Sequence, residues 1–489
     1  MQNPALCLMI VVMQMQMKTY DNQRKEDIMH TYQIDFKKPV HVHFIGIGGI
    51  SMSGLAEILL KEGFTISGSD NKESALTDHL ESLGATVFYG QKASNIIEGI
   101  DVVVYTAAIH EDNEEYRAAV GKNLPMLTRA ELLGQLMKNY ETPVAISGTH
   151  GKTTTTSMLS HILLEGELDP TISVGGILKA IGGNIRVGDS EVFVTEACEY
   201  TNSFLDFFPK IGVILNIEED HLDFFKDLQD IRNSFHKFAK LLPEDGTLII
   251  NQAIENLEEL TEDLPCQVLS FGMEEACDYS AANISHDEKG DASFDLLKKG
   301  TFVQRIALSV NGDHNVQNAL AAIGAADTMG VPMDVIARGI KSFTGTDRRF
   351  QLKGEKNGIT IVDDYAHHPT EIKATLAAAE HYPHKEIWCI FQPHTYTRTK
   401  SLFDDFVEAL THTDHVIMAD IYAARETDTL GVSSEDLAKA LKEKGCDAYY
   451  LPSFEAIENF CLDHCQKGDL LITMGAGDVV NIGEELLKA

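Results

Sequence analysis

The sequence predicts an α/β protein with three domains: a Rossmann-like N-terminal domain, a P-loop ATPase-like central domain and a Rossmann-like C-terminal domain. A chain of 489 residues is too long for one hydrophobic core and suits about three. Short apolar runs that indicate buried strands alternate with helical patterns along most of the chain, which is typical of mostly parallel sheets. Two of these runs lead directly into glycine-rich loops. We expect the domains to cover residues 36–139, 140–343 and 344–489.

The charge balance narrows the classes of partner. The net charge is −34, from 74 acidic and 40 basic residues. Nucleic acid and anionic membrane surfaces would repel such a chain, so we expect neither as a partner. The glycine loops nevertheless indicate phosphate ligands. A few local groups must therefore outweigh the repulsion between the phosphates and the net negative charge of the protein. Bound Mg²⁺ would add positive charge there.

Cysteine usage indicates a reducing compartment. The eight cysteines include no Cys-x-x-Cys pair, and several lie in apolar runs, such as Cys389 between Trp388 and Ile390. Such cysteines behave as small core side chains. We therefore expect a cytoplasmic protein.

The first 35 residues differ from the rest of the chain. An apolar run at residues 5–13 has no basic residues ahead of it and a Gln/Met run behind it. It is too short to cross a bilayer and lacks the charged flank of a signal peptide. We expect residues 1–35 to be a disordered or mis-annotated extension, with Met17 and Met29 as possible start sites.

In the N-terminal domain, a strand at 40–45 leads into the first glycine loop, residues 46–54. The loop has Gly46 and Gly48 but Ser51 where a dinucleotide fingerprint has its third glycine, and Ser51 is small enough for helix–strand packing. A helix is expected at 55–62 and a second strand at 64–67, after which Asp70 stands where such folds bind a ribose or base. The loop alone supports NAD, FAD or a UDP-sugar about equally, or a purely structural turn.

The central domain begins with the strongest motif. A strand at 143–146 precedes the loop from Gly148 to Thr153, and a helix follows at 155–164. Glycines let backbone N–H groups face phosphate oxygens at a helix N-terminus, Lys152 can reach the β- and γ-phosphates, and Thr153 can ligate Mg²⁺. The loop is a shortened form of the general motif, because position 146 is isoleucine. It predicts an ATP site.

Carboxylates and an imidazole follow the next two strands of this domain. The strand at 191–195 leads to Glu196, and the strand at 211–216 leads to residues 218–223, which include His221. Oxygen ligands with one histidine suit Mg²⁺ or Mn²⁺, while Cys198 is expected to pack in the core. Acids at 218–223 could equally be a solvated helix start before the helix at 224–241.

Further along, the central sheet is expected to continue through the strand at 247–251 and a hairpin at 292–310. The helix that opens near Gly312 places His314, Asn315 and Asn318 on one face of its first turn. These asparagines could cap the helix or bind a base, and their spacing does not decide between the two.

The C-terminal domain follows a linker at 343–350 that ends in Arg348 and Arg349. Five strands are expected, separated by helical patterns, which indicates a mostly parallel sheet. They lie at 359–362, 387–391, 416–419, 448–451 and 470–473. Polar loops follow several of these strands, notably residues 363–371 and 392–399, and so many polar strand ends favour a binding site.

The order of these motifs resembles the Mur ligases, ATP-dependent amide-forming enzymes of peptidoglycan synthesis, from about residue 40 to the end of the chain. Within that family the resemblance is to the members that join L-alanine to UDP-N-acetylmuramate. It rests on eight stretches: HFIGIGGISMSGLA (43–56), ISGTHGKTTTT (146–156), TEACEYTNSFL (195–205), LNIEEDHLDFF (215–225), DHNVQNALAA (313–322), DDYAHHPTEI (363–372), FQPHTYTRT (391–399) and MGAGD (474–478).

The resemblance implies the substrates UDP-N-acetylmuramate, L-alanine and ATP, with Mg²⁺, and it implies roles for particular residues. The implied catalytic residues are Lys152, Arg349, His367 and Arg398. ATP is expected at Gly148, Thr149, His150, Gly151, Lys152, Thr153, Thr154, Asn315, Asn318 and Asp364. The UDP-sugar is expected at Gly46, Gly48, Gly49, Ile50, Ser51, Asp70, Thr106 and Asn184. Amino-acid binding is expected at His367, His394 and Arg398, and metal binding at Thr153, Glu196 and His221.

Three positions depart from the family pattern. Ser51 replaces a glycine, Cys198 stands where an aspartate is common, and Thr395 stands where relatives often have arginine. The last departure concerns the contact to the amino-acid carboxylate.

Other functions remain possible from the residues alone. A peptidoglycan-recycling ligase would join a whole peptide to the same sugar nucleotide, although the 391–399 stretch favours alanine. An NAD-dependent oxidoreductase would use the loop at 46–54 but would have no role for Lys152, Glu196 and Arg349. A regulatory nucleotide-binding module without catalysis would keep the phosphate loop but would need no alanine site. We expect a monomer or weak homodimer.

Overall fold

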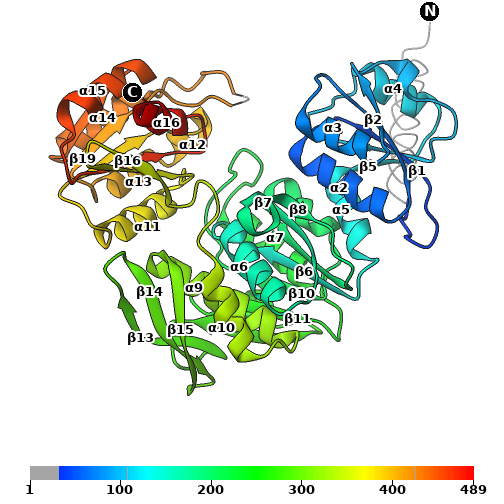
Figure 1. Cartoon of the computed structure of the whole chain (residues 1–489), viewed down its shortest axis with the longest axis horizontal. Helices are drawn as coiled ribbons and strands as arrows, with labels where there is room; N and C mark the ends of the chain where they lie inside the picture. Colours follow the sequence, from blue (N-terminus) through cyan, green and yellow to red (C-terminus); the bar gives the residue numbers. More distant parts are fainter. Residues whose placement is uncertain (1–31, 107, 425, 489) are drawn as a thin grey trace, which may run out of the picture.

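The computed structural model describes residues 32–106, 108–424 and 426–488, and it consists of three α/β domains (Figure 1). The expected start sites Met17 and Met29 lie outside the described residues. Each domain has its own sheet, and each sheet lies inside one of the predicted ranges. The N-terminal and C-terminal domains lie on opposite sides of the central domain in Figure 1. The predicted fold class is confirmed.

The N-terminal sheet is fully parallel, in the order β3-β2-β1-β4-β5. Its strands are β1 (His41–Ile45), β2 (Thr65–Asp70), β3 (Thr86–Tyr89), β4 (Val102–Tyr105) and β5 (Met126–Thr128). Its helices are α2 (Ile50–Lys61), α3 (Ala75–Ser82), α4 (Glu114–Gly121) and α5 (Arg129–Met137). Because β1 lies in the middle, its loop emerges between β2 and β4, where ligands of open parallel sheets bind.

The central sheet has ten strands in the order β15-β14-β13-β12-β11-β10-β6-β9-β7-β8. The strands are β6 (Thr142–Ser147), β7 (Thr171–Leu178), β8 (Gly183–Arg186), β9 (Val192–Ala197), β10 (Ile211–Ile214), β11 (Thr247–Asn251), β12 (Gln267–Gly272), β13 (Tyr279–His286), β14 (Asp291–Lys298) and β15 (Thr301–Asn311). The helices are α6 (Lys152–Glu165), α7 (Leu228–Ala239), α8 (Glu258–Thr261), α9 (Asp313–Thr328) and α10 (Met333–Ser342). Strands β14 and β15 pair antiparallel, as the sequence predicts.

The C-terminal sheet has the order β16-β17-β21-β18-β19-β20, and β16 alone runs antiparallel to its neighbour. The strands are β16 (Gln351–Lys356), β17 (Ile359–Asp364), β18 (Ile387–Phe391), β19 (His415–Met418), β20 (Asp447–Tyr450) and β21 (Leu470–Met474). The helices are α11 (Pro369–Glu380), α12 (Tyr396–Ser401), α13 (Phe403–Leu410), α14 (Ser434–Glu443), α15 (Phe454–His464) and α16 (Val480–Lys488).

Two expectations about the N-terminal region need correction. Helix α2 begins at Ile50 rather than at Leu55, so the end of the glycine loop is already helical. The expected extension also reaches too far along the chain, because Ile34 is buried and its carbonyl accepts a 3.0 Å hydrogen bond from Asn139 Nδ2. Residues 32–35 therefore contribute to the fold.

Helix α2 also holds the N-terminal domain against the central one. A Cβ atom on Gly54 would lie 2.0 Å from Ile185 Cγ1 of strand β8, so only glycine permits this close approach. The contact brings β8, which also carries Asn184, against the helix that follows the first glycine loop.

Two further observations concern the class of protein. Within the described ranges, no helix is both long and apolar enough to cross a membrane. The seven cysteines that the structure describes are all free, and four of them are buried: Cys266, Cys277, Cys389 and Cys461. This matches the expectation that they pack as small side chains.

Candidate active site between the central and C-terminal domains

The phosphate loop connects β6 to α6 and has the backbone that its glycines predict. Gly148 has φ 143° and Gly151 has φ 84°, a region that strains other residues. Asn216, at the end of β10, fixes the loop: its Oδ1 accepts from the backbone N of His150 at 2.8 Å, and its Nδ2 donates to the carbonyl of His150 at 3.1 Å. The Thr149 hydroxyl accepts from the backbone N of Glu218 at 2.9 Å. The loop is therefore held in shape by the adjacent strand end.

Lys152 occupies the position expected of the phosphate-binding lysine, the first residue of α6. Its Nζ donates to Glu199 Oε2 at 2.9 Å and to the carbonyl of Thr149 at 3.1 Å. Burial lowers the pKa of Lys152, but Glu199 outweighs burial and holds the pKa above its ordinary value. A charged ammonium is therefore held against the carbonyls of the phosphate loop, although Lys152 is not among the residues that line the large cavity beside the loop.

The candidate metal ligands form two adjoining pairs. Thr153 Oγ1 donates to Glu196 Oε2 at 3.1 Å, and His221 Nε2 lies 3.8 Å from Glu199 Oε1. That Glu199 oxygen is buried and has no hydrogen-bond partner among the described residues. A Glu196 carboxylate bonded to the Thr153 hydroxyl, together with a buried Glu199 oxygen that lacks a hydrogen bond, offers oxygen donors of the kind that suit Mg²⁺. Glu199 was not among the residues predicted to bind metal.

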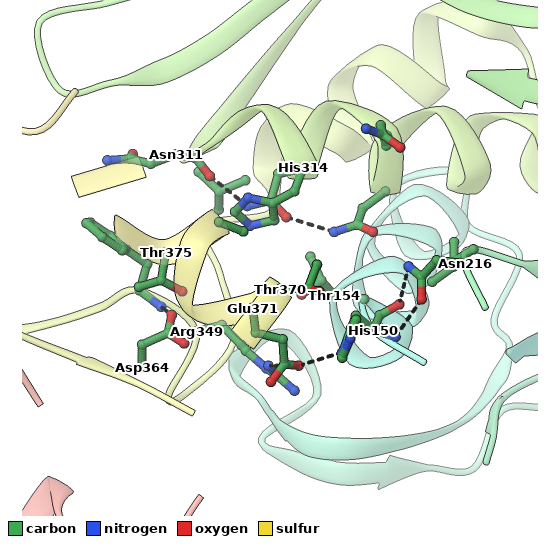
Figure 2. Close-up of a pocket in the computed structure, with 18 of the residues that line it drawn as sticks. His150, Thr154, Asn216, Asn311, His314, Arg349, Asp364, Thr370, Glu371 and Thr375 are labelled. Atoms are coloured by element: carbon green, nitrogen blue, oxygen red, sulfur yellow. Dashed lines mark hydrogen bonds and ion pairs between the residues drawn. The ribbon is translucent and has the colours of Figure 1, made fainter. Parts of the chain in front are cut away.

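A cavity of about 1040 Å³ lies beside the phosphate loop, between the central and C-terminal domains (Figure 2). Its walls include residues from both domains that the sequence placed at ATP or in catalysis. These are His150, Gly151, Thr154, Asn315, Asn318, Arg349 and Asp364. The size suits a nucleotide-sized ligand.

The two asparagines of α9 lie against the phosphate loop. Asn318 Oδ1 accepts from Thr155 Oγ1 at 3.3 Å, and a Cβ on Gly151 would lie 2.5 Å from the same oxygen. Asn318 Nδ2 donates to Asn315 Oδ1 at 3.0 Å, and Asn315 Nδ2 donates to the carbonyl of Asn311 at 2.7 Å. The helix N-cap is Gly312, which has no side chain and so makes no capping hydrogen bond of that kind. The asparagines thus line the cavity instead of capping the helix.

The adjacent Arg348 and Arg349 differ in position. Arg348 Nε donates to Asp363 Oδ2 at 3.0 Å and its other nitrogens donate to the carbonyls of Gly475 and Gly477, so Arg348 fixes the linker to the C-terminal sheet. Arg349 lines the cavity, with NH1 3.6 Å from Glu371 Oε1. Of the two, only Arg349 lines the cavity beside the phosphate loop.

Asp364 is buried at the end of β17 in the cavity wall. Its oxygens accept from the backbone N of Phe350 and of Ala366, each at 2.7 Å. Burial raises the pKa of Asp364 to about 6, although Arg349 lowers it. The carboxylate therefore organises the linker backbone in addition to facing the cavity.

A second pocket, of about 460 Å³, contains the predicted amino-acid-binding residues His367, His394 and Arg398 together with His221. Arg398 NH2 donates to Asp220 Oδ1 at 2.8 Å, and its NH1 lies 3.3 Å from His394 Nδ1. Burial raises the pKa of Asp220, but Arg398 outweighs it and keeps the pKa well below its usual range. The pocket thus has walls from two domains and a fixed guanidinium.

Thr395 lies at the start of α12 in the wall of this pocket. Its φ of 67° is unusual for a β-branched residue, and such strained backbone tends to occur at functional sites. The conformation is held because the Thr395 N donates to the carbonyl of Tyr422 at 2.9 Å and the Thr399 hydroxyl donates to the Thr395 carbonyl at 2.6 Å. Thr395 therefore sets the direction of the helix that carries Arg398.

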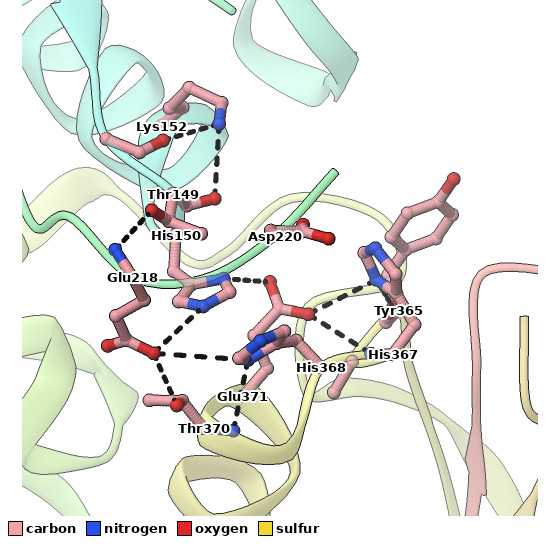
Figure 3. A network of polar contacts seen from close by, with 12 residues as sticks. Thr149, His150, Lys152, Glu218, Asp220, Tyr365, His367, His368, Thr370 and Glu371 are labelled. Atoms are coloured by element: carbon pink, nitrogen blue, oxygen red, sulfur yellow. Dashed lines mark hydrogen bonds and ion pairs between the residues drawn. The ribbon is translucent and has the colours of Figure 1, made fainter. Parts of the chain in front are cut away.

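A network of ionisable side chains joins the two pockets, with Glu371 of α11 at its centre (Figure 3). Glu371 Oε1 lies 3.2 Å from His150 Nδ1 of the phosphate loop, and Glu371 Oε2 lies 3.2 Å from His367 Nδ1. Burial raises the pKa of Glu371, but His367 and His150 outweigh it, so the pKa lies well below its ordinary value. Burial lowers the pKa of His150, but Glu371 and Glu218 raise it to about 9.

The N-terminal glycine loop forms a separate site. Gly46 has φ 87°, and a Cβ there would lie 2.7 Å from Thr106 Cγ2. The Gly48 N donates to Asp70 Oδ2 at 2.9 Å, so the predicted acid holds the loop.

The first residues of α2 are exposed. Ile50 is 57% exposed, and Ser51 is exposed too, so Ser51 does not take the packing role expected of it. Gly49 caps α2 without a side-chain hydrogen bond.

Sequence reasoning missed three residues of the site: Glu199, Asp220 and Glu371. Each lies within a stretch that the resemblance included, so the motifs contained them. Their partners come from distant segments, Lys152, Arg398 and His150 respectively. No spacing pattern within one motif could have identified these pairs.

Three family models match almost the whole described chain. They are the Mur ligase family catalytic domain at residues 41–141, the Mur ligase middle domain at 146–326, and the Mur ligase glutamate ligase domain at 348–477.

Similar proteins are known by sequence and by structure. A UDP-N-acetylmuramate–L-alanine ligase from Lachnoclostridium phytofermentans is 59% identical over 467 residues, which cover 94% of this chain and 100% of the relative. The crystal structure of the UDP-N-acetylmuramate–alanine ligase from Thermotoga maritima has a TM-score of 0.75 at 28% identity, covering 92% of this chain and 98% of that one. A murein peptide ligase from Psychrobacter arcticus has a TM-score of 0.65 at 26% identity, with the same coverage of both chains.

Proposed function

Because the chain belongs to the Mur ligase family, we propose that it joins L-alanine to the muramate carboxylate of UDP-N-acetylmuramate at the expense of ATP, in peptidoglycan synthesis. The observation that carries the proposal is the 59% identity, over nearly the full length of both chains, to a ligase of that name. The geometry supports it, since a phosphate-loop cavity and a pocket with a fixed guanidinium lie on either side of Glu371.

In the first step, the muramate carboxylate attacks the γ-phosphorus of ATP, ADP leaves, and an acyl phosphate forms. We propose that Lys152 and Arg349 stabilise the negative charge on the transferred group from opposite sides, one from the phosphate loop and one from the C-terminal domain. Neither side chain needs to enter from solvent, because Lys152 already lies over the loop and Arg349 already lines the cavity.

Magnesium fits this site through residues Thr153 and Glu196, with Glu199 and His221 beside them. When bound, Mg²⁺ would neutralise charge on the ATP phosphates. We propose Thr153 and Glu196 as ligands because the two side chains are already in contact. The Glu199 oxygen that lacks a hydrogen bond supports the site. Glu196→Ala or His221→Ala should raise the Mg²⁺ concentration needed for turnover.

In the second step, the neutral amine of alanine attacks the acyl carbon, and the tetrahedral intermediate collapses with loss of phosphate. We propose that Arg398 binds the alanine carboxylate, while His367 and His394 line the remainder of the pocket. A planar guanidinium suits a carboxylate because it can donate two parallel hydrogen bonds. Enclosure between two domains protects the acyl phosphate from water.

The alternative acceptor is a peptide, as in the recycling ligases. The pocket of about 460 Å³ and the higher similarity to alanine ligases favour the single amino acid. The test is a competition: UDP-N-acetylmuramate and ATP are incubated with equal concentrations of L-alanine and of a cell-wall tripeptide, and the products are identified by mass spectrometry. The alanine adduct should dominate, and a predominant tripeptide adduct would reject the assignment.

We further propose a cytoplasmic enzyme that acts as a monomer or weak homodimer, with neither nucleic acid nor membrane as a partner. The supporting facts are the net charge of −34 and the free cysteines of the described chain.

A further inference from the structure

We propose that His150, Glu218 and His368 form a binding site for a divalent transition-metal ion of the Zn²⁺ type, which links the central domain to the C-terminal domain. His150 comes from the phosphate loop, Glu218 follows strand β10, and His368 is the N-cap of α11. The proposed site is distinct from the Mg²⁺ ligands, because it shares no residue with Thr153, Glu196 and His221, although His150 also belongs to the predicted ATP-binding loop.

The three ligand atoms are already grouped. His150 Nε2 lies 3.4 Å from Glu218 Oε2, His368 Nδ1 lies 4.0 Å from the same oxygen, and all three atoms are within 4.8 Å of one another. Ligands at about 2.1 Å from a tetrahedral ion are about 3.4 Å apart. The first pair has that separation, and the other separations, at up to 4.8 Å, require the His368 ring to move toward both other ligands.

The opposite nitrogen of each histidine has an acceptor that turns its lone pair toward the group. His150 Nδ1 lies 3.2 Å from Glu371 Oε1, and His368 Nε2 lies 3.0 Å from the carbonyl of Glu219. Histidines that bind metals usually donate their other N–H to a carboxylate or a carbonyl in this way. The Glu218 carboxylate is itself held, since Thr370 Oγ1 donates to its Oε2 at 2.5 Å.

His150 Nε2 faces the same group from a buried position. Its nearest acceptor is Glu218 Oε2, at 3.4 Å, which is longer than a good hydrogen bond, so a cation between the two atoms could bind both of them. A proton can occupy this nitrogen, because Glu371 and Glu218 attract positive charge, and a cation would compete with that proton. On His368, the cation would displace a long bond of 3.3 Å from the Thr370 N, a first-turn helix donor that can remain free.

The donor types select the class of ion. Two imidazole nitrogens and one carboxylate oxygen suit Zn²⁺ or Co²⁺ better than Mg²⁺, which prefers a ligand set made mostly of oxygens. His150, Glu218 and Thr370 line the large cavity, so a water molecule could take the fourth position. Burial lowers the pKa of His368, which keeps that ring neutral and able to coordinate.

A bound ion would connect segments that are distant in sequence. In this structure the same segments are joined by the Glu371–His150 pair and the Thr370–Glu218 bond. A coordination bond is stronger than either contact, so the ion should hold the phosphate loop against α11 and stabilise the arrangement of the two domains.

Cobalt spectroscopy on the full-length protein tests the site. Metal-free protein is titrated with Co²⁺ in the presence of excess Mg²⁺, which occupies the Thr153 and Glu196 site, and visible absorption reports four-coordinate Co²⁺. The variants are His368→Gln and Glu218→Gln. The matched controls are His412→Gln, an exposed histidine of the C-terminal domain, and His221→Gln. Thermal melting confirms that each variant is folded.

We expect one equivalent of Co²⁺ to give intense visible bands in the unaltered protein and in both control variants. His368→Gln and Glu218→Gln should each weaken Co²⁺ binding by about 10-fold or more and abolish the bands. In parallel, Zn²⁺ should raise the melting temperature of the unaltered protein but not of His368→Gln. The proposal is overturned if the unaltered protein gives no such bands, if they persist in His368→Gln, or if His221→Gln removes them.

Discussion

The first glycine loop and the phosphate loop are both built from a parallel strand, glycines and a helix start, yet they depend on different parts of the molecule. The first is held within its own domain, by the bond from Gly48 to Asp70. The phosphate loop faces a second domain, whose Glu371 contacts its His150 directly. The difference teaches that a glycine loop alone does not define a site, because the groups that complete it can come from elsewhere in the chain.

The two loops are expected to serve different steps of the reaction. The sugar nucleotide is expected on the first loop, with Asn184 of the central domain as a further contact, whereas phosphoryl transfer and alanine binding are expected in pockets between the central and C-terminal domains. Changes at the domain interface should therefore impair the reaction while leaving sugar-nucleotide binding intact. Each substitution below tests this division.

Lys152→Ala should have the largest effect. Removing the ammonium over the phosphate loop should lower the ligation rate by about a thousand-fold or more, while UDP-N-acetylmuramate binds with unchanged affinity. Steady-state kinetics measures the first quantity and calorimetry the second. Equal losses of both would mean that the two loops do not act separately.

Arg398→Ala should raise the KM for alanine with little change in the KM for ATP. Losing a charge-assisted contact to a partly desolvated carboxylate costs about 2–5 kcal/mol, or roughly 30-fold to several-thousand-fold in affinity. Because the change also removes the guanidinium partner of Asp220, Asp220→Asn provides the matched control. Adding Thr395→Arg should recover part of the loss. If alanine and ATP dependence deteriorate equally, Arg398 has a structural or phosphate-side role instead.

Glu371→Gln should have an intermediate effect on both two-domain pockets. The amide keeps the shape of the side chain but removes the charge that holds His150 and His367. We expect kcat/KM to fall by about 10–100-fold for both ATP and alanine, with no change in sugar-nucleotide affinity. Glu380→Gln, at the exposed end of the same helix, is the control. Normal kinetics in Glu371→Gln would remove this carboxylate from the reaction.

Asp70→Asn should have the smallest effect, confined to the first loop. An amide oxygen can still accept from the Gly48 N, so the loop should keep its shape. Losing the charged acceptor should weaken UDP-N-acetylmuramate binding by about 1 kcal/mol, or roughly 5-fold, without altering the KM for ATP. Calorimetry with UDP-N-acetylmuramate and with NAD measures it, and tighter binding of NAD than of the UDP-sugar would contradict the assigned ligand.

Local sequence predicted most of the fold. The phosphate loop, the strand at 247–251 and the strand at 387–391 appear where periodicity placed them, because buried parallel strands are continuous apolar runs. The start of α2 was misplaced, since glycines at 48 and 49 concealed a helix that begins at Ile50. Packing of residues 32–35 was missed because their few apolar side chains have no periodic pattern.

The site was predictable only in part. Phosphate loops carry a local signature, so the sequence alone predicts Lys152 and Thr153 at the start of the helix that follows the loop. The distinction between Arg348 and Arg349 does not, because it depends on the backbone direction at a linker where Arg348 has φ 61°. Glu371 and Asp220 each pair with a side chain of another domain, His150 and Arg398 respectively. The sequence around either acid does not reveal such a partner.

The most direct test of the central claim is phosphate release from ATP. The unaltered protein is assayed with ATP and Mg²⁺ alone, with UDP-N-acetylmuramate added, and with UDP-N-acetylmuramate and L-alanine together. Sustained release should require all the substrates, because the acyl phosphate formed in one pocket is consumed by the amine bound in the other. Release that proceeds equally well without L-alanine, or without the sugar nucleotide, would contradict the proposed function.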